Sequence, residues 1–455
     1  MDSAVKNQAL VDALAKNLPE DANEAQVSDI FASELFNFLG FEVNERVPSF
    51  YTRSGTDPVD HALRHNMEND IFNQTKTNPD ILVELKKRNL NLAPGSKGYK
   101  DTFKQIKRYL LAENCQAVKW GIITNANHIQ LFRKHGKVIH PATVCLEINS
   151  ENIIKIATSI QEKIDNPQRA LTVAVYNKKG GVGKTTTTVN TAATLSLLNK
   201  KVLIVDFDPD QRDLTNSLAI KSSQPSFNQC LVNESINVRD VIYPYKRKFK
   251  NLQKEFGFDV IPIPLDEPLE VWHEDKLRQE IDVTKLSEIL EPLKNNYDYI
   301  LIDSSPNWRI FSQSAIYAAD VVLIPTKHNN FFSLENAAVA IKKYIPEVQR
   351  KRKDGGPLIL PIFFNGEKAT EAQMKDAKSH INQLIKDAKQ DQNNKFDLLP
   401  YFYPRYTPAN KNMKIFELPN YASIAKSAFS NVPAVYKEKI VREYYKSLVK
   451  EYFLL

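Results

Sequence analysis

The chain has 455 residues, 42% hydrophobic and 25% charged, which is typical of a soluble globular protein of two or three domains. It has no apolar run long enough to span a bilayer, no secretory signal, and only three widely spaced cysteines, so we expect a cytoplasmic protein without disulfides or a zinc site. The net charge of +7 permits nucleic acid as a partner without requiring it.

Residues 1–150 are expected to form a compact α/β domain. Helical patterns occur in VSDIFASELFNFLGF and DTFKQIKRYLLAEN, and strand patterns occur in VDHALRHN, DILVELKKRN, AVKWGIITN and HIQLFRKHG. Glu84 and Lys86 are two residues apart on one expected strand, so their side chains share a face, and Asp60 begins the preceding strand. Two carboxylates that hold Mg²⁺ beside a lysine are suited to phosphodiester hydrolysis.

The order of these segments resembles the nuclease domain, of the PD-(D/E)xK class, found in type I restriction motor subunits. The motifs that carry the resemblance are DHAL, ELK, QIKRY and WGIITN. It implies a restriction-endonuclease-like fold with candidate site residues Glu34, Asp60, Glu84, Lys86 and Gln105. Asp80 competes with Asp60 but lies too close to Glu84 for the usual two-strand arrangement. His61 and the insertion between Asp60 and Glu84 depart from the nuclease pattern and favour a fold kept for binding.

A linker helix is expected over residues 151–168, where isoleucine and alanine recur at helical spacing before Asn166-Pro167 ends the pattern. Residues 169–455 then alternate short apolar runs with helical stretches; the runs are LTVAVYN, KVLIVDFD, FDVIPIP, YILIDSS, DVVLIPT and LILPIFFN. This alternation predicts a doubly wound, mostly parallel sheet. We expect the last strand in KFDLLPYFYPRY (395–406), and a solvated helix face in the basic insertion YKRKFKNLQKEF (245–256).

The segment VYNKKGGVGKTTTTVN contains a phosphate-binding loop that departs from G-x-x-x-x-G-K-[ST], because Lys178 replaces the first glycine. A strand, a glycine loop and a helix start surround an anion with backbone N–H groups. Lys184 supplies charge to the β and γ phosphates, and the Thr185 hydroxyl completes a Mg²⁺ shell. The expected nucleotide-binding residues are Lys179, Gly180, Gly181, Val182, Gly183, Lys184, Thr185 and Thr186.

The box KGGVGKTT resembles the deviant Walker A motif of the ParA/MinD family of dimeric ATPases. The resemblance implies ATP and Mg²⁺ as cofactors and an ATP-dependent homodimer in which Lys179 reaches the partner's nucleotide. The second box, KVLIVDFDPDQRDLT, implies Asp208 as the aspartate that orients the attacking water, so the catalytic set is Lys179, Lys184 and Asp208. YDYILIDSSP resembles Walker B, with Asp303 beside the metal. Asn365 occupies the position of a base-contacting asparagine, although a strand-ending turn residue is an equal alternative.

The last 51 residues carry nine Lys/Arg against four Asp/Glu, a net charge of +5. ParA-type relatives bind DNA of any sequence through basic C-terminal residues, whereas MinD-type relatives end in an amphipathic membrane helix. The tyrosine-rich stripe of the last helix favours core packing and phosphate contact over membrane binding. The candidate DNA contacts are Arg405, Lys437, Lys439, Arg442 and Lys446.

The sequence therefore predicts a ParA-type ATPase that segregates or positions DNA, with a plasmid as the expected cargo. Its expected partners are non-specific DNA and a small ParB-type protein, and its expected location is the nucleoid. Two alternatives are an ATP-regulated nuclease in genome defence and a MinD-like protein that positions a membrane or other cargo.

Overall fold

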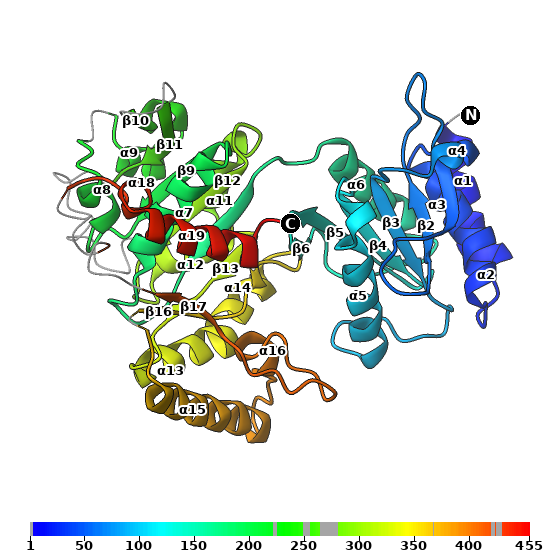
Figure 1. Cartoon of the computed structure of the whole chain (residues 1–455). Coiled ribbons are helices and arrows are strands. Elements are labelled where there is room, and N and C mark those ends of the chain that lie inside the picture. The colour runs from blue at the N-terminus through cyan, green and yellow to red at the C-terminus, as the bar shows by residue number, and fades with distance from the viewer. Residues whose placement is uncertain are drawn as a thin grey trace. The chain divides into compact units, whose positions relative to one another are not determined.

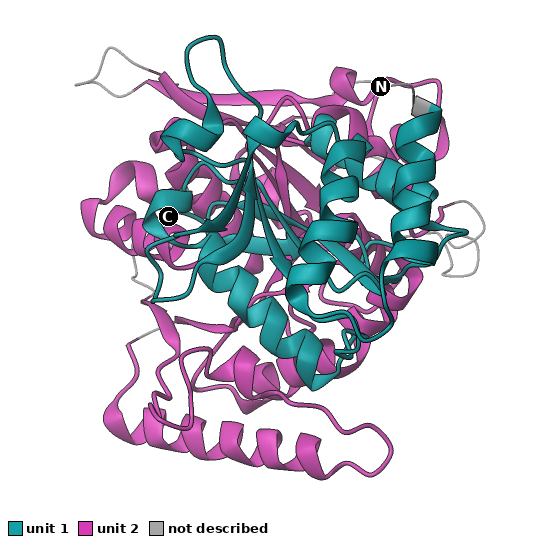
Figure 2. Cartoon of the chain, turned by 90° about the vertical axis from the view of Figure 1, so that its right-hand side faces the viewer, with its two compact units in different colours: residues 1–167, 353–355, 453–455 teal, residues 168–352, 356–452 magenta. Residues whose placement is uncertain are grey.

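The computed structural model describes residues 3–221, 225–248, 255–263, 281–366, 368–419, 424 and 430–455. The chain divides into two compact units (Figure 2). Unit 1 comprises residues 1–167, 353–355 and 453–455, and unit 2 comprises residues 168–352 and 356–452. Within the described ranges, the helices are too short or too polar to cross a membrane.

Unit 1 is a mixed α/β unit (Figure 1). Its helices are α1 (Ser3–Asp12), α2 (Glu24–Gln26), α3 (Ser33–Phe38), α4 (Phe72–Thr75), α5 (Lys97–Leu110) and α6 (Ile153–Asp165). Its strands are β1 (Arg46–Phe50), β2 (Val59–Leu63), β3 (Ile81–Leu85), β4 (Trp120–Thr124), β5 (His128–His135), β6 (Val138–Pro141) and β7 (Leu146–Glu147).

The sheet of unit 1 has the order β1-β2-β3-β4-β5-β6, with β7 on β5, and only the β3–β4 pair is parallel among its described pairs. Successive side chains of β3 point to opposite faces. Ile81, Val83 and Leu85 pack with α1, α3 and α6, whereas Leu82 packs with α5. Glu84 and Lys86 follow Leu82 in this alternation, which directs them to the face that α5 covers. The helix α6, expected as a linker, contributes buried residues to the core of unit 1.

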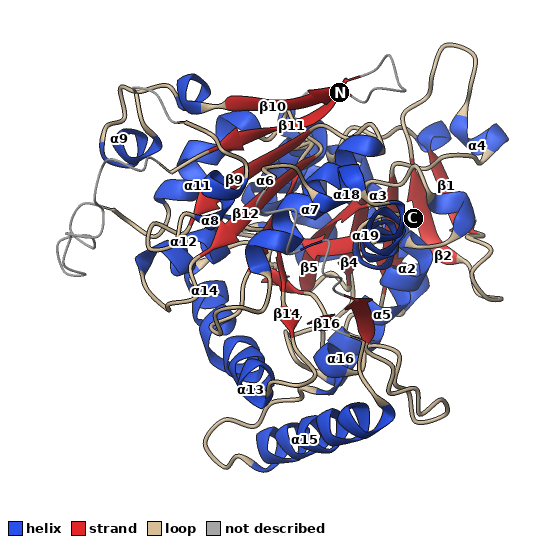
Figure 3. Ribbon diagram, turned by 60° about the vertical axis from the view of Figure 1, so that its left-hand side comes forward, coloured by secondary structure: helices blue, strands red, loops and turns tan. Residues whose placement is uncertain are grey.

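Unit 2 contains most of the helices and two sheets (Figure 3). Its helices are α7 (Lys184–Leu197), α8 (Asp213–Ser217), α9 (Phe227–Val232), α11 (Lys285–Leu290), α12 (Ile310–Ala318), α13 (Phe331–Val339), α14 (Ile345–Lys351), α15 (Glu371–Gln390), α16 (Leu399–Phe402), α18 (Ala434–Lys437) and α19 (Lys439–Tyr452). Its strands are β8 (Leu171–Val175), β9 (Val202–Phe207), β10 (Tyr243–Lys248), β11 (Glu255–Ile261), β12 (Tyr299–Ser304), β13 (Val321–Leu323), β14 (Pro325–Thr326), β15 (Leu358–Ile359), β16 (Phe363–Gly366) and β17 (Phe416–Pro419).

The larger sheet of unit 2 has the order β10-β11-β9-β12-β8-β13-β15 and is parallel except for the β10–β11 hairpin. Helices α7 and α19 pack together on one side, while α11 and α12 pack against the other. The predicted doubly wound, mostly parallel sheet is confirmed. Parallel strands covered on both faces need continuous apolar runs, and the six runs in the sequence supply them.

Two of those runs divide between two sheets. DVVLIPT forms β13 in the large sheet and then β14 in a small sheet of order β14-β16-β17, and LILPIFFN forms β15 and then β16 in the same way. Pro325 and Pro361 fall at the two divisions. Proline has no N–H to donate to a strand ladder, so each proline ends pairing in one sheet.

Two expectations were wrong. Residues 395–406 do not form the last strand: Leu399-Pro400 begins the short helix α16, which suits the fixed φ of proline in a first helical turn, and the last strand is β17. The insertion 245–256 contains strand β10 instead of a helix, because Tyr245 is buried between the exposed Pro244 and Lys246 in strand alternation. Residues 249–254 of this insertion lie outside the described residues.

Candidate functional site

The phosphate loop joins the carboxyl end of β8 to the first residue of α7, Lys184. Gly181 and Gly183 have positive φ values of 73° and 84°, which glycine adopts without strain. At Gly183 a Cβ atom would also collide with the side-chain amide of Asn365. The loop backbone can therefore closely approach a phosphate that is bound at the N-terminus of α7.

Lys184 is buried, with 7% of its surface exposed. Burial lowers the pKa of its ammonium group, and the nearby carboxylates of Asp303 and Asp208 oppose that shift. A buried cation needs compensating negative charge. Lys184 thus lies beside two carboxylates, an arrangement that suits the binding of a phosphate chain together with a metal ion.

Asp303 lies near the end of β12, a strand that runs between β9 and β8. It pairs in register with Asp206 of β9 and with Val175 of β8. Its side chain is buried and hydrogen-bonded to the Thr185 side chain, while its Oδ1 atom has no hydrogen-bond partner among the described atoms. Burial, with the charge of Asp206 next in size, raises the pKa of Asp303 well above its usual range. An unsatisfied buried carboxylate oxygen beside a threonine hydroxyl fits a Mg²⁺ site.

The two aspartates of the second box differ in their surroundings. Oδ2 of Asp206 accepts hydrogen bonds from the backbone N–H of Thr215 (2.9 Å) and from its hydroxyl (2.6 Å), so this carboxylate fixes the start of α8. Burial raises the pKa of Asp206 to about 6. The carboxylate of Asp208 accepts hydrogen bonds from neighbouring backbone N–H groups, a long one of 3.4 Å from Gln211 and one from Asp210. Its remaining lone pairs are free to orient a water molecule.

Asn365, at the end of β16, braces the phosphate loop. Its Nδ2 atom donates to the backbone oxygen of Val182 at 2.9 Å and lies 3.3 Å from the hydroxyl oxygen of Thr187. The side chain that the sequence assigned to the base therefore contacts the loop and helix α7 directly. The sequence around Asn365 does not indicate this contact, because the two residues that form it are 183 positions apart.

The two lysines before the glycines are placed differently. Lys178 lies on Tyr344, with Nζ 3.2 Å from its hydroxyl oxygen and 5.6 Å from its ring centroid. Lys179 is half-buried, and its backbone N–H donates to Oδ1 of Asn177 at 2.9 Å. Within the described ranges, the ammonium group of Lys179 has no hydrogen-bond or ion-pair partner. This charge is available to a group that the described residues do not supply.

Asn177 is a site residue that the motif analysis missed. Its Nδ2 atom donates to the backbone oxygens of Pro325 (2.9 Å) and Ser333 (3.2 Å), which ties the first turn of α13 to the phosphate loop. That turn exposes Phe331 and Phe332, with 44% and 68% of their surfaces accessible. The two adjacent phenylalanines can be seen in the sequence, but the sequence does not show that they lie beside the phosphate loop.

In unit 1, Asp60, Glu84 and Lys86 converge on one face of the sheet. Lys86 Nζ lies 2.5 Å from Glu84 Oε1, and Asp60 Oδ2 accepts the N–H of Leu85 at 2.6 Å. Burial, followed by the charge of Asp60, raises the pKa of Glu84 to about 7, and Glu84 Oε2 has no partner among the described atoms. Glu24, 3.8 Å from Lys86, belongs to this cluster although the sequence did not indicate it.

The other residues named for unit 1 lie outside this acidic cluster. Glu34 bonds Asn37 within its own helix at 3.1 Å, and Gln105 bonds the hydroxyl of Tyr109 one turn along α5 at 3.2 Å. Asp80 forms an ion pair with Lys119 at 3.4 Å. Among the described residues, no group of three or more His, Cys, Asp or Glu side chains has metal-binding geometry.

The buried face of α19 is formed by Val441, Tyr445, Leu448, Val449 and Tyr452. The hydroxyl of Tyr445 lies 3.4 Å from the backbone oxygen of Thr186 in α7, whereas Ile440 of the predicted stripe is exposed. Two of the candidate DNA contacts are neutralised by acids, since Arg405 pairs with Glu451 at 2.7 Å and Lys446 with Glu443 at 3.1 Å. The remaining three face uncharged groups or solvent, and they are Lys437, beside the Ser430 hydroxyl, Arg442, on the Val435 carbonyl oxygen, and exposed Lys439.

The family model described as "AAA domain" matches residues 170–355. The chain is 36% identical over 165 residues to the sporulation initiation inhibitor protein Soj of Bacillus subtilis, a match that covers 36% of this chain and 60% of Soj. It is 29% identical over 248 residues to the chromosome partitioning protein ParA of Caulobacter vibrioides, covering 52% of this chain and 85% of that protein. The chain spans 57% to 60% of the length of the first curated relatives it matches.

Solved structures with similarity to the chain include apo McdA of Cyanothece, at 21% identity and a TM-score of 0.45, covering 62% of this chain and 98% of that one. They also include the septum site-determining protein MinD of Pyrococcus horikoshii with Mg-ADP, at 22% identity and a TM-score of 0.44, covering 62% of this chain and 95% of that one.

Proposed function

We propose that the chain hydrolyses ATP as a P-loop ATPase of the ParA/MinD type and uses its ATP-bound state to segregate or position DNA, with a plasmid as cargo. The match of residues 170–355 to the AAA-domain model and the similarity to Soj and ParA support this proposal. The supporting observation is the convergence of Lys184, Asp303 and Asp208 at the phosphate loop. Thr185 and Asp303 would hold Mg²⁺, which supplies positive charge to the phosphate oxygens. Lys184 binds the phosphates, and Asp208 orients the water.

An ATP-dependent homodimer is the proposed active form. The uncommitted ammonium group of Lys179 and the exposed Phe331 and Phe332 both adjoin the phosphate loop. Contiguous exposed apolar side chains favour a protein partner, and a second copy would bring a second nucleotide to each Lys179. Binding energy between the copies would then depend on ATP.

Non-specific DNA is the proposed partner of this dimer, together with a small ParB-type protein that stimulates hydrolysis. Among the described residues, no carboxylate forms an ion pair with Lys437, Lys439 or Arg442, so these three are the proposed phosphate contacts. Dimerisation doubles the number of such contacts on one DNA molecule, and the affinity should fall as salt rises.

The Lys179→Ala variant is expected to bind ATP with nearly wild-type affinity but to remain a monomer. The reason is that Lys184 still neutralises the phosphates of its own chain, whereas the charge supplied to the partner is lost. Light scattering with ATP and Mg²⁺ measures the mass, and fluorescence anisotropy with a DNA duplex measures the binding that depends on the dimer.

Lys178→Ala is the matched control, because Lys178 lies on Tyr344 within the same chain. It should dimerise and bind DNA like the wild type. A Lys179→Ala protein that dimerises normally would contradict the proposed role of Lys179. A wild-type dimer that ignores DNA would leave the ATPase proposal standing and remove its DNA partner.

An ATP-regulated nuclease is a second candidate function, favoured by one observation: Asp60, Glu84 and Lys86 meet on one sheet face. The partnerless Glu84 Oε2 atom fits a divalent metal held by Glu84 and Asp60. Lys86 would lie beside the scissile phosphate once its pairing with Glu84 is released. This arrangement supports the restriction-endonuclease-like prediction for unit 1.

If unit 1 cuts DNA, the wild-type protein with ATP and Mn²⁺ should nick supercoiled plasmid, and Glu84→Ala should lose the activity because a metal ligand is removed. Glu34→Ala is the control, since Glu34 bonds Asn37 away from the cluster and its loss should leave nicking intact. Gel electrophoresis of the plasmid gives the result. Absence of nicking by the wild type would restrict unit 1 to a binding role.

A further inference from the structure

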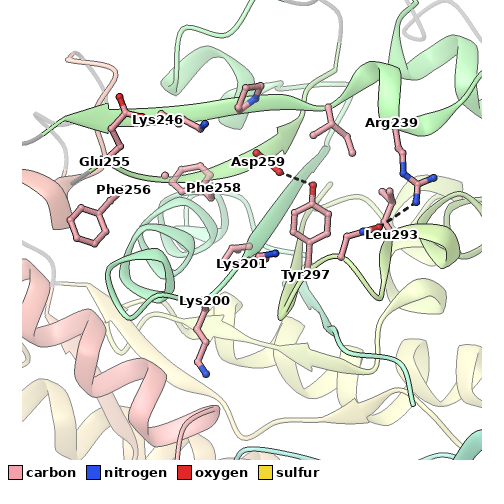
Figure 4. Close-up of a pocket in the computed structure, with 15 residues that line it drawn as sticks. Lys200, Lys201, Arg239, Lys246, Glu255, Phe256, Phe258, Asp259, Leu293 and Tyr297 are labelled. Atoms are coloured by element: carbon pink, nitrogen blue, oxygen red, sulfur yellow. Dashed lines mark hydrogen bonds between the residues drawn. The ribbon is translucent and has the colours of Figure 1, made fainter. Parts of the chain in front are cut away.

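A groove of about 730 Å³ lies at the edge of the large sheet of unit 2, on the β10–β11 hairpin (Figure 4). Lys200 and Lys201 border it immediately before β9, and Asn296 and Tyr297 border it just before β12. These are the amino ends of parallel strands, whereas the phosphate loop follows the carboxyl end of β8. This hairpin groove is therefore a separate site at the opposite edge of the sheet.

The side chains of the hairpin groove carry an excess of positive charge. Its cations are Lys200, Lys201, Arg239 and Lys246, and its two acids are Glu255 and Asp259. Both acids are engaged: Glu255 pairs with Lys248 at 3.5 Å, and Asp259 Oδ2 accepts the hydroxyl of Tyr297 at 2.7 Å.

The ammonium groups of Lys201 and Lys246 have no hydrogen-bond or ion-pair partner in the described part of the chain. Figure 4 shows Lys246 on the strand above Asp259 and Lys201 below Asp259, beside Tyr297. Arg239 is held in place, because its Nη2 atom donates to the Pro292 carbonyl oxygen at 3.0 Å and lies 3.3 Å from Asn296 Oδ1. Two free cations and one fixed guanidinium thus line one concave surface.

Apolar side chains share this surface with the cations. Ile242, Pro244, Phe256 and Leu293 line the groove, and Phe256 is half-buried. A phosphate backbone uses cations but gains little from apolar contacts, whereas a peptide offers both carboxylates and apolar side chains. The volume also falls in the range of about 300–1,000 Å³ that encloses compact ligands. The mixed lining therefore favours an acidic peptide over a DNA duplex.

We infer that the hairpin groove binds an acidic, partly apolar segment of a partner protein, with carboxylates facing Lys201, Lys246 and Arg239 and an apolar side chain on Phe256. The described residues of the basic insertion belong to the two strands of this hairpin, with 245–248 in β10 and 255–256 in β11, and the ATPase chemistry leaves them without a role. The inference goes beyond the proposed function, because none of these residues touches the nucleotide site. Such a partner carries the same sign of charge as DNA, so the test must include a DNA duplex as a second probe.

The test uses full-length protein and a fluorescein-labelled synthetic peptide in which Glu alternates with Leu, read by fluorescence anisotropy. The wild type should bind it, and the double variant Lys201→Glu/Lys246→Glu should bind it at least about tenfold more weakly, with the wild-type affinity falling as salt rises. The control reverses two exposed lysines of α15, Lys375→Glu/Lys386→Glu, and should bind like the wild type. A peptide with Lys in place of Glu should not bind.

If the double variant still binds ATP, it is folded. A loss of peptide binding can then be assigned to the groove and is independent of the proposed ATPase function. Equal peptide binding by the wild type and the double variant would overturn the inference, as would no binding by either. A duplex DNA probe that binds the wild type but not the double variant, in the absence of peptide binding, would also overturn it and assign the groove to nucleic acid.

Discussion

Lys184→Ala is expected to lower the affinity for ATP by roughly 100-fold or more and to remove hydrolysis with it. The ammonium group is buried between the phosphate loop and the carboxylates of Asp303 and Asp208. Its loss leaves those acids to repel the phosphates in a buried site, where the lower effective dielectric strengthens the repulsion. The loss of ATP affinity therefore has two causes: the attraction between Lys184 and the phosphates is lost, and the two acids repel the phosphates.

Titration with a fluorescent ATP analogue measures this loss, and Lys179→Ala is the matched comparison within the same loop. Both variants remove one ammonium group from neighbouring positions, but only Lys184 is buried against the two acids. Wild-type affinity in Lys184→Ala, or an equal loss in both variants, would contradict the division of roles between the two lysines.

The phosphate loop was predictable because its signal is local. A strand, glycines at fixed offsets and a helix start occupy fewer than twenty consecutive residues, and backbone geometry determines the rest. The same holds for the parallel sheet, whose apolar runs are each sufficient to indicate a buried strand. Asp303 followed from its place at the end of such a run.

Contacts between distant segments were not predictable in this way. Asn365 reaches the loop from a strand 183 positions away, and Glu24 reaches Lys86 from a helix outside the nuclease-like motifs. The strand in the basic insertion was missed because Lys246, Arg247 and Lys248 are all exposed, so this part of the segment does not alternate between apolar and polar residues. The error at Leu399-Pro400 arose because an aromatic run favours a strand, whereas proline can begin a helix.

The two acids of the second box provide the last prediction. Asp208→Ala is expected to bind ATP and form the dimer while hydrolysis falls by about 100-fold or more, because a group that orients or accepts a proton from water is worth roughly 10²–10⁴ in rate. The carboxylate of Asp208 accepts hydrogen bonds from the adjacent backbone N–H groups of Gln211 and Asp210, so its removal affects contacts within its own loop. Phosphate release measures turnover, and light scattering measures the dimer.

Asp206→Ala should behave differently, although Asp206 lies on β9 only two residues before Asp208, which follows the end of that strand. The carboxylate of Asp206 fixes both the N–H and the hydroxyl of Thr215, so its removal should destabilise the fold by about 3 kcal/mol. Thermal unfolding should thus separate the variants: a lower Tm for Asp206→Ala and a nearly unchanged one for Asp208→Ala. Asp210→Ala, which removes an exposed acid bonded to Asn307 at 3.1 Å, is the control for both readouts. If Asp208→Ala turned over ATP at the wild-type rate, the water-orienting role would pass to another group, and Asp206 would be the nearest acid to test.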